Sequence, residues 1–575
     1  MGSCLGCCVL EANRYSGRTV KALLQLPMME HVTSLIITGS GTIEIRLLGS
    51  YINHRLLEST DRERQHQPHI FMHACAAWGH NKPFITLAVL IAEARPNVMQ
   101  TILTNATIYP KLMGEINMLP RERLDVVKER IHVLNVGGMT GLQPHETMDN
   151  VASAFEALYN KSGIVKCQSS GKTIGGPGFP SPTVAIIDPF STYAIRGIRA
   201  IASPREVPIL SWYTSTAGSL SRYSAPEEFG GIPDFTTLID EEVKRSGRNF
   251  GEVADEVVKS VKGEIIRLPG YPPLYDYEMH PQAIEVPGQG RLLYTLQNST
   301  YQVEGTISIS NSVLEADAIR AMRQYFKSMG KEWINIGPIS GTPHLPPSSD
   351  KDVEVLSFLD RMEKTFGSKS VVYISFGSLW YPPEVGTVYA ILDELIAERV
   401  PFIFASASPL AQVPDDVKQR IRNSGIGLNV SWAPQERVLG HPATGWFLTH
   451  GGWNSVQEAL AYKVPLIFWP MGGDQCLNSV LLTLKYKAAF ELIEVRTGEK
   501  GKRRPYRCGP DGPSPRFTVE SAREEFRGVL KSIRGEEGEA VRSNFMGIAE
   551  KVAKVWDEGG EAREQLETLL KIFAD

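Results

Sequence analysis

Two short apolar runs, separated by a glycine turn and a helical pattern, constrain the fold of this chain more than any other feature. The runs are Gly445–Thr449 and Pro465–Trp469, and each has the length and the apolar content of a buried strand. Between them, apolar residues recur on one face of a helix, at Val456, Ala459 and Leu460. Strand, helix and strand in this order predict a βαβ unit, whose ligands lie outside the carboxyl ends of its strands.

The turn after the first run is suited to bind a phosphate. His450–Gly452 closes the strand, and Asn454 and Ser455 follow as natural N-cap residues of the helix. Glycines let a ligand approach the backbone, and the free N–H groups of a helix N-terminus attract anions. The second run opens into a glycine-bearing loop with Asp474 and Gln475, whose side chains suit sugar hydroxyls. The sequence therefore predicts a nucleotide-sugar site at this edge of the sheet.

From Trp432 to Gln475 the chain resembles the signature box of the family 1 UDP-dependent glycosyltransferases, in spacing as well as in residue types. Many plant members have a cysteine after the histidine, whereas this chain has Gly451, a difference that concerns packing more than chemistry. The alternative is a purely structural βαβ unit with a core tryptophan. The resemblance implies that uracil stacks on Trp432 and pairs with the Ala433 backbone, and that Gln435 and Glu458 bind the ribose. It also implies that His450, Asn454 and Ser455 bind the diphosphate. The sugar would be bound by the Trp453 backbone, Asp474 and Gln475.

A second part of the site is predicted near residue 80. His69–Cys75 is typical of a strand, and His80 follows it at the start of a helix, in which Pro83 suits the first turn. The positive end of a helix disfavours imidazolium, so we expect His80 to be neutral and able to accept a proton. Asp188 ends another buried strand, Thr183–Ile187, on the same edge, where its carboxylate can orient the ring.

The resemblance also places the family's catalytic base at His80, and members carry an aspartate at the end of the strand before Asp188. Two structural readings compete with these roles, a histidine that only packs and an aspartate that only caps a helix.

Other segments have less specific patterns. Lys166–Pro182 lacks the first glycine of a phosphate loop, so we interpret it as a surface loop near the acceptor entrance. Leu268–Pro281 is rich in proline and tyrosine. The resemblance implies that it lines an acceptor pocket, and the alternative is a packed cover over the core. Gly501–Arg516 is basic and is interpreted as a solvent loop. By the resemblance, Thr214 reaches toward the far hydroxyl of the sugar, with Thr216 as the alternative.

Composition limits the class of protein. With 575 residues, 42% hydrophobic and 22% charged, the chain is long enough for more than one globular domain. A net charge of −4 gives no reason to expect a nucleic-acid partner. Seven cysteines, few and widely spaced after residue 8, indicate neither a disulfide framework nor a zinc motif, so we expect a reducing, cytoplasmic location. The chain holds no apolar run long enough to predict a transmembrane span.

The first 66 residues are the hardest to interpret. They begin Met-Gly-Ser-Cys-Leu-Gly-Cys-Cys, which is similar to a myristoylated and palmitoylated terminus, although Gly6 stands where Ser or Thr is usual. Weak lipid anchoring, with a peripheral membrane location, is therefore one reading. The other is a poorly ordered extension or an incorrect upstream start.

The fold class predicted is α/β, and the resemblance implies the GT-B arrangement of two doubly wound, Rossmann-like domains facing a central cleft. A new strand at Val371–Phe376 leads into a glycine turn, where Ser378 is expected to touch the diphosphate. The expected segments are an extension (1–66), an acceptor-binding domain (67–336), a Pro/Gly/Ser-rich linker (337–352), a UDP-sugar-binding domain (353–550) and a C-terminal helix that crosses back to the first domain (551–575).

The function that the resemblance implies is inverting O-glycosyl transfer from a UDP-sugar, a co-substrate, to a hydroxyl of a lipophilic small molecule such as a terpenoid or a phenolic compound. Gln475 favours glucose, and xylose stays open. Positive charge for the leaving diphosphate is expected from the helix at Asn454 and from His450, with no metal and no other cofactor. Two alternatives are a sterol or glycolipid glycosyltransferase at a membrane surface and a catalytically silent UDP-sugar-binding protein.

Overall fold

The fold is described from a computed structural model, which covers residues 67–137, 145–232, 234–284, 288–339 and 352–573, together with three strands nearer the N-terminus. The chain divides into two units, Met1–Gln65 and His66–Asp575. In the first unit three strands pair antiparallel in the order β1-β2-β3. They are β1 (Lys21–Leu24), β2 (Thr33–Ile37) and β3 (Ile43–Arg46). The proposed acylation sites, Gly2 and the cysteines after it, lie outside the described residues.

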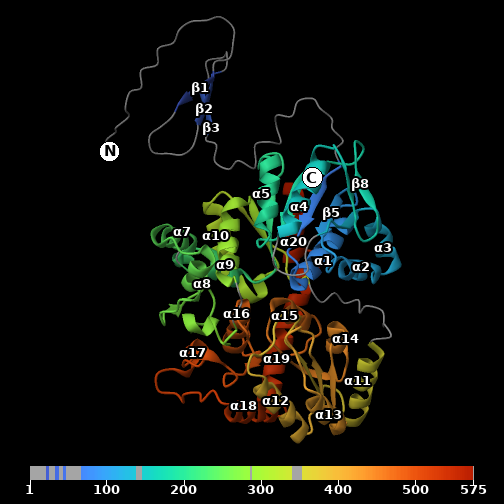
Figure 1. Cartoon of the computed structure of the whole chain (residues 1–575), viewed down its shortest axis with the longest axis vertical. Helices are drawn as coiled ribbons and strands as arrows, with labels where there is room; N and C mark the ends of the chain where they lie inside the picture. Colours follow the sequence, from blue (N-terminus) through green and yellow to red (C-terminus); the bar gives the residue numbers. More distant parts are fainter. Residues whose placement is uncertain are drawn as a thin grey trace, which may run out of the picture. The chain divides into compact units, whose positions relative to one another are not determined.

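The second unit contains two parallel sheets (Figure 1). The first has seven strands in the order β14-β13-β10-β9-β4-β5-β6, and its order reverses between β4 and β9. We call residues 67–339 the N-terminal half. The strands are β4 (His69–His73), β5 (Met99–Thr104), β6 (Ile131–Asn135), β9 (Val184–Ile187), β10 (Ile209–Tyr213), β13 (Gly305–Ser308) and β14 (Glu332–Asn335).

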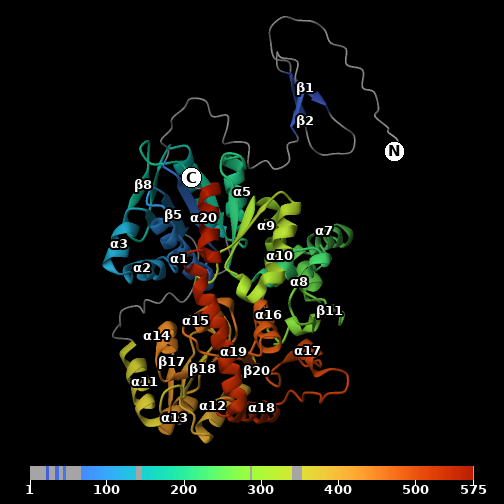
Figure 2. The ribbon, with the colours of Figure 1, turned by 180° about the vertical axis from the view of Figure 1, so that it is seen from behind.

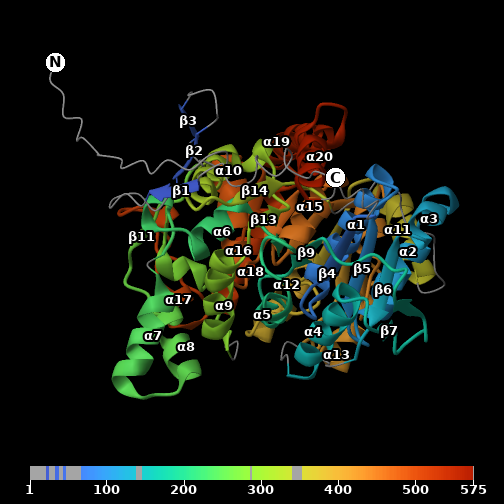
Figure 3. The same cartoon turned by 90° about the horizontal axis from the view of Figure 1, so that it is seen from above.

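Both faces of this sheet are buried, which explains why its strands are continuous apolar runs. One face packs against α1 and α10, and the other against α4 and α5. Figure 3 shows α7 and α8 at the end of this half that is distant from α2 and α3. The helices are α1 (Trp78–Ala94), α2 (Tyr109–Asn117), α3 (Arg121–Lys128), α4 (His145–Tyr159), α5 (Thr192–Ile201), α6 (Ala217–Ser224), α7 (Phe235–Ser246), α8 (Phe250–Lys259), α9 (Gln289–Gln302) and α10 (Ser312–Ser328).

The second sheet has six parallel strands in the order β17-β16-β15-β18-β19-β20, and it reverses between β15 and β18. We call residues 352–573 the C-terminal half. Its helices α12, α13 and α18 cover one face, and α11, α15 and α16 the other. The strands are β15 (Val371–Ser375), β16 (Phe402–Ala405), β17 (Gly427–Val430), β18 (Thr444–Thr449), β19 (Leu466–Phe468) and β20 (Ala489–Glu491). The predicted α/β fold with two doubly wound sheets is confirmed.

The helices of the C-terminal half are α11 (Val353–Phe366), α12 (Val385–Ala397), α13 (Asp415–Ser424), α14 (Gln435–Gly440), α15 (Trp453–Ala461), α16 (Asp474–Val480), α17 (Gly498–Gly501), α18 (Val519–Ser532), α19 (Glu536–Val552) and α20 (Glu561–Phe573). In Figure 2, α19 runs beside the second sheet, and α20 continues onto the N-terminal half. There Glu567 pairs with Arg95 at 2.9 Å, and Glu561 accepts hydrogen bonds from Ser312 and Asn335. Residues 340–351 of the proposed linker lie outside the described part, so the domain limits stay a prediction.

Three expectations about local structure were wrong. Pro83 lies inside α1, because the helix already begins at Trp78. The N-cap of α15 is Gly452, so Asn454 and Ser455 belong to its first turn and cap nothing. Residues 166–182 are not a plain surface loop: they begin at the end of β7 (Ile164–Lys166), which pairs with β8 (Thr173–Gly175) in a hairpin, and none of them lines the large cavity.

The described cysteines, Cys75, Cys167, Cys476 and Cys508, are all free thiols. Among the described residues, no helix has the length and the hydropathy of a membrane span.

The proline-aromatic loop, residues 268–281, is a packed cover and does not line the main cavity. It carries β12 (Leu274–Tyr275) and ends near Glu278, a buried carboxylate. Glu278 Oε2 lies 3.2 Å from Nη1 of Arg496, whose Nη2 lies 2.9 Å from Glu491 on β20. Arg507 also pairs with Glu491, and the Tyr506 backbone N–H donates to Glu278, so the basic segment 501–516 is partly packed and is not a free solvent loop.

We expect this buried ion network to make a large contribution to the stability of the second unit. Replacing Arg496 by Met leaves two buried carboxylates with less compensating charge, and breaking a buried pair in this way costs about 3–5 kcal/mol of unfolding free energy. The exposed pair of Lys418 and Asp415 is the control, because such pairs contribute at most about 1 kcal/mol. Urea unfolding followed by circular dichroism measures both variants, and equal midpoints for Arg496→Met and Lys418→Met contradict the prediction.

Candidate functional site

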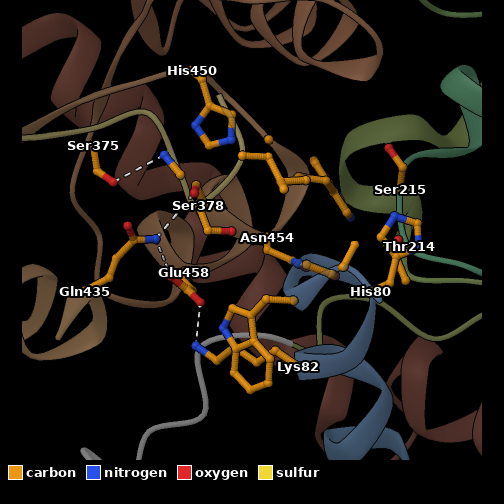
Figure 4. Close-up of a pocket in the computed structure, with 18 of the residues that line it drawn as sticks. His80, Lys82, Thr214, Ser215, Ser375, Ser378, Gln435, His450, Asn454 and Glu458 are labelled. Atoms are coloured by element: carbon orange, nitrogen blue, oxygen red, sulfur yellow. Dashed lines mark hydrogen bonds and ion pairs between the residues drawn. The ribbon is translucent and has the colours of Figure 1, made fainter. Parts of the chain in front are cut away.

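A cavity of about 680 Å³ is lined by segments of both halves that follow the carboxyl ends of strands. From the N-terminal half come the segments after β4 and β10, and from the C-terminal half those after β15, β18 and β19. These are the edges at which doubly wound sheets bind ligands. Figure 4 shows side chains from both halves directed into this space.

His80 and Asp188 form a tightly bonded pair at the reversal of the first sheet. His80 is in the first turn of α1, after β4, and Asp188 directly follows β9, the neighbouring strand. Nδ1 of His80 lies 2.5 Å from Oδ2 of Asp188, whose side chain is fully buried. Oδ1 accepts a hydrogen bond from the backbone N–H of Phe190, whereas the N-cap of α5 is Ser191, so Asp188 does not cap that helix. With Nδ1 held by Asp188, Nε2 is the nitrogen left for chemistry in the cavity.

The charge of His80 differs from the sequence-based expectation. Burial alone lowers its pKa, but the carboxylate of Asp188 and the neighbouring thiol of Cys75 together raise it well above the usual 6.5. The nearby carboxylate therefore outweighs the helix terminus, and the prediction of a neutral imidazole was wrong.

His450 occupies the equivalent place after β18 but has the opposite charge state. Burial lowers its pKa to about 4, despite a hydrogen bond to the Ser375 backbone. A Cβ at Gly377 or at Gly452 would lie within 3.0 Å of the ring, so both glycines leave room for it. The expectation that His450 supplies positive charge was wrong, because a neutral imidazole can only offer a hydrogen bond. Ser378 lies in the adjoining turn and lines the cavity.

The first turn of α15 is tied to the first turn of α1. Asn454 Nδ2 donates to the carbonyl oxygen of Gly79 at 2.6 Å. Within α1 that carbonyl would normally accept from the residue four positions later, which is Pro83 and has no N–H. The proline thus frees an acceptor that the other half uses. Trp453, next to Asn454, is buried and donates through its indole to the Ile309 carbonyl at 3.0 Å.

Trp432, Ala433, Gln435 and Glu458 lie together at one end of the cavity. Trp432 is 56% exposed, which excludes a core tryptophan and leaves its face open to a planar ligand. Nε2 of Gln435 donates to Glu458 at 2.6 Å and to the Ser455 hydroxyl at 3.3 Å. Glu458 is buried, with its carboxylate facing the cavity.

Thr214, Asp474 and Gln475 line the cavity with His80. Thr216, the alternative to Thr214, is instead the N-cap of α6. Burial raises the pKa of Asp474, whose Oδ2 accepts a hydrogen bond from Ser215 at 2.7 Å. Gln475 is fixed by the backbone N–H of Met471, which donates to its side-chain oxygen at 2.8 Å.

All fourteen of the proposed site residues are therefore accounted for: Asp188 binds His80 from behind, and the others line the cavity. Two cavity residues of the N-terminal half were not predicted from the sequence. Lys82 contacts Glu458, and Ser215 contacts Asp474, both in the C-terminal half. Neither has a local signal, since each partner is more than 250 residues away in the chain.

Comparisons with known proteins agree with this geometry. Residues 341–499 match the family described as UDP-glucoronosyl and UDP-glucosyl transferase. The chain is 30% identical to UDP-glycosyltransferase eriJ of Hericium erinaceus over 508 residues, which cover 86% of this chain and 96% of that protein. It belongs to the UDP-glycosyltransferase family.

The solved structures show the same fold for this glycosyltransferase. Phytolacca americana UGT2, complexed with UDP-2fluoro-glucose and pterostilbene, aligns with a TM-score of 0.61 at 22% identity, over 88% of this chain and 100% of that one. A UGT transferase from Siraitia grosvenorii in complex with UDP aligns with the same TM-score at 19% identity, over 88% and 100%. The two sheets and the cavity between their edges are thus a GT-B fold.

One cluster in the described part of the glycosyltransferase has the composition of a metal site, namely Cys75, His80 and Asp188. One ligand atom of each lies within 4.8 Å of the others, and zinc accepts sulfur, nitrogen and oxygen ligands of this kind. An ion bound there would compete with Asp188 and with an acceptor proton for the imidazole of His80. This cluster is therefore suited to an inhibitory ion and is unsuited to one that assists a base at His80.

We expect Zn²⁺ to lower the transferase activity and a chelator to restore it. Replacing Cys75 by Ala removes a ligand, and it should raise the Zn²⁺ concentration for half-inhibition by at least about tenfold. Cys508→Ala, at a partly exposed thiol outside the cavity, is the matched control. The measurement is a Zn²⁺ titration of initial rates, and equal inhibition of Cys75→Ala and wild type contradicts the assignment.

Proposed function

We propose that this protein is an inverting, metal-independent O-glycosyltransferase that moves glucose from UDP-glucose to a hydroxyl of a lipophilic small molecule. The observation that carries the proposal is the pair of His80 and Asp188, held at 2.5 Å, with His80 lining the same cavity as Trp432, Glu458 and Asp474. A base and a nucleotide-sugar site that share one cavity are what direct transfer to a hydroxyl requires.

In the proposed reaction, Nε2 of His80 removes the proton of the acceptor hydroxyl. The acceptor oxygen forms a bond to the anomeric carbon on the face opposite UDP, while the bond from that carbon to the UDP oxygen breaks and UDP keeps the electron pair. The configuration therefore inverts. Asp188 stabilises the imidazolium that forms, and the amides at the start of α15 stabilise the leaving diphosphate.

The donor sugar is proposed from the residues at the sugar end of the cavity. Asp474 and Gln475 offer a carboxylate and an amide to sugar hydroxyls, and Thr214 faces the same region. The Phytolacca protein was solved with a glucose analogue of the donor, which supports glucose. UDP-xylose is the competing donor, because it lacks only the outer hydroxymethyl group.

The acceptor is proposed from the lining of the N-terminal half. Beside His80 the cavity presents apolar and aromatic side chains, and the Phe190 ring lies 5.6 Å from the imidazole. Such a lining suits a terpenoid or phenolic alcohol with one hydroxyl directed at the base. The residues concerned are Phe190, Tyr213, Tyr223, Leu293 and Leu296.

The first test is a mass-spectrometric screen with UDP-glucose and UDP-xylose against terpenoid, phenolic and sterol alcohols. We expect a product one hexose heavier, formed about 10²–10⁴-fold more slowly by His80→Ala, which should still bind UDP. His441→Ala is the matched control, because His441 also pairs with an aspartate, Asp360, but lies outside the cavity. Near-normal turnover in His80→Ala refutes the assignment of His80 as the base. UDP binding without any product favours the catalytically silent binding protein. Products formed from sterols favour the glycosyltransferase at a membrane surface.

We also expect a pH dependence that follows the raised pKa of His80. The base acts only when deprotonated, so kcat/KM should fall as the pH drops through a pKa above the usual 6.5. Asp188→Asn removes the charge that raises this pKa, and it should move the acidic limb to lower pH while lowering the maximal rate. Rates measured from about pH 5 to 9 in constant ionic strength test this, and an unmoved limb contradicts the role of Asp188.

A further inference from the structure

Lys82 lies in the donor end of the cavity, although it belongs to the N-terminal half. It is in α1, two residues after His80. Its Nζ lies 2.7 Å from Oε1 of Glu458 and forms a still shorter contact with Oε1 of Glu436. All three side chains are at least four-fifths buried. Figure 4 draws Gln435, Glu458 and Lys82 linked by dashed lines on one side, and His80, Thr214 and Ser215 on the other.

The positive charge of Lys82 lies among three carboxylates, those of Glu458, Glu436 and Glu115. Burial by itself lowers the pKa of Lys82, but Glu458, Glu436 and Glu115 together raise it, so the ammonium stays charged. Glu115 lines the same part of the cavity, and burial raises its pKa. Without Lys82 these acids would face one another with their main counter-charge removed.

Glu458 is held at both oxygens by fixed donors. Oε1 accepts a hydrogen bond from Nζ of Lys82 at 2.7 Å, and Oε2 accepts one from the amide Nε2 of Gln435 at 2.6 Å. A carboxylate has about four acceptor positions, so each oxygen can still accept a hydroxyl. The two donors fix the orientation of the carboxylate before a ligand arrives.

We propose that Lys82 is a donor-positioning residue, which holds Glu458 charged and oriented for the ribose hydroxyls of the UDP-sugar. The inference rests on the proposed function, because it needs a nucleotide whose ribose reaches Glu458. Lys82 also places a positive charge near the negatively charged diphosphate of the ligand, and this attraction likewise strengthens binding of the UDP-sugar.

The position of Lys82 in α1 connects the ribose site to the base. Residues two apart on a helix point about 200° from each other around the axis. His80 therefore faces Asp188, while Lys82 faces Glu436 and Glu458 of the other half. One helical turn thus fixes the distance between the group that contacts ribose and the group that takes the acceptor proton.

A purely structural ion pair is the competing explanation, and donor binding separates the two. A structural pair lowers stability without a specific change in UDP affinity. A positioning residue weakens UDP and raises the KM for the UDP-sugar, while kcat at saturating donor and the KM for acceptor change little.

The experiment is calorimetric titration of the full chain with UDP, which needs no acceptor and no turnover. We expect Lys82→Met to weaken UDP about 10- to 100-fold, as for loss of a hydrogen bond to a charged group, and Lys82→Arg to restore most of the affinity. Lys128→Met is the matched control, since Lys128 lies on the surface of α3 and pairs only weakly with Asp125. Its UDP affinity should equal that of wild type.

A double-mutant cycle with Glu458→Gln tests the route of the effect. If Lys82 acts through Glu458, Lys82→Met should change UDP affinity less than about threefold in that background. Glu436→Gln leaves Lys82 and Glu458 in place, so it should weaken UDP binding less than Lys82→Met does. It is the substitute variant if Lys82→Met does not fold.

The outcomes are distinguishable. If wild type binds UDP and Lys82→Met binds it equally well, the positioning role is refuted and the proposed function stands. If Lys82→Met weakens UDP as much in the Glu458→Gln background as in the wild-type background, the route through Glu458 is refuted. If wild type fails to bind UDP, the proposed function fails together with the role of Lys82.

Discussion

The reversal of strand order in each parallel sheet is the constraint on which the cavity depends. In the first sheet the reversal falls between β4 and β9, and in the second between β15 and β18. At such a point the loops after two neighbouring strands diverge to opposite faces and leave an opening. His80 and Asp188 occupy one opening, and Ser378 and His450 occupy the other. The side chains can therefore differ widely in sequence position and still meet.

The two histidines show how the same side chain acquires opposite properties at equivalent places. Each follows a strand at a reversal, and each is largely surrounded by protein. His80 faces the buried carboxylate of Asp188, and its pKa is raised, whereas His450 faces backbone and glycines, and its pKa falls to about 4. The surroundings therefore shift the pKa values of two histidines of the same cavity in opposite directions.

Much of this arrangement could be read from the sequence, and the failures share a cause. The strands before His80, Asp188 and His450 are apolar runs with both faces buried, so they and the residues that follow them were predictable. The start of α1, the N-cap of α15 and the charges of the two histidines were not, since these depend on contacts made in the folded state. Lys82 belongs with these, because its partners lie far along the chain.

The hydrogen bond from Asn454 to Gly79 has a consequence for how such enzymes diversify. Its acceptor is a main-chain oxygen, released because Pro83 cannot donate to it. A main-chain acceptor is present whatever side chain is attached, so the residues between Cys75 and His80 can change without loss of this alignment between the halves. Several of them, including Ala77 and Trp78, line the cavity. Selection can therefore reshape this wall of the cavity while His80 keeps its position relative to the C-terminal half.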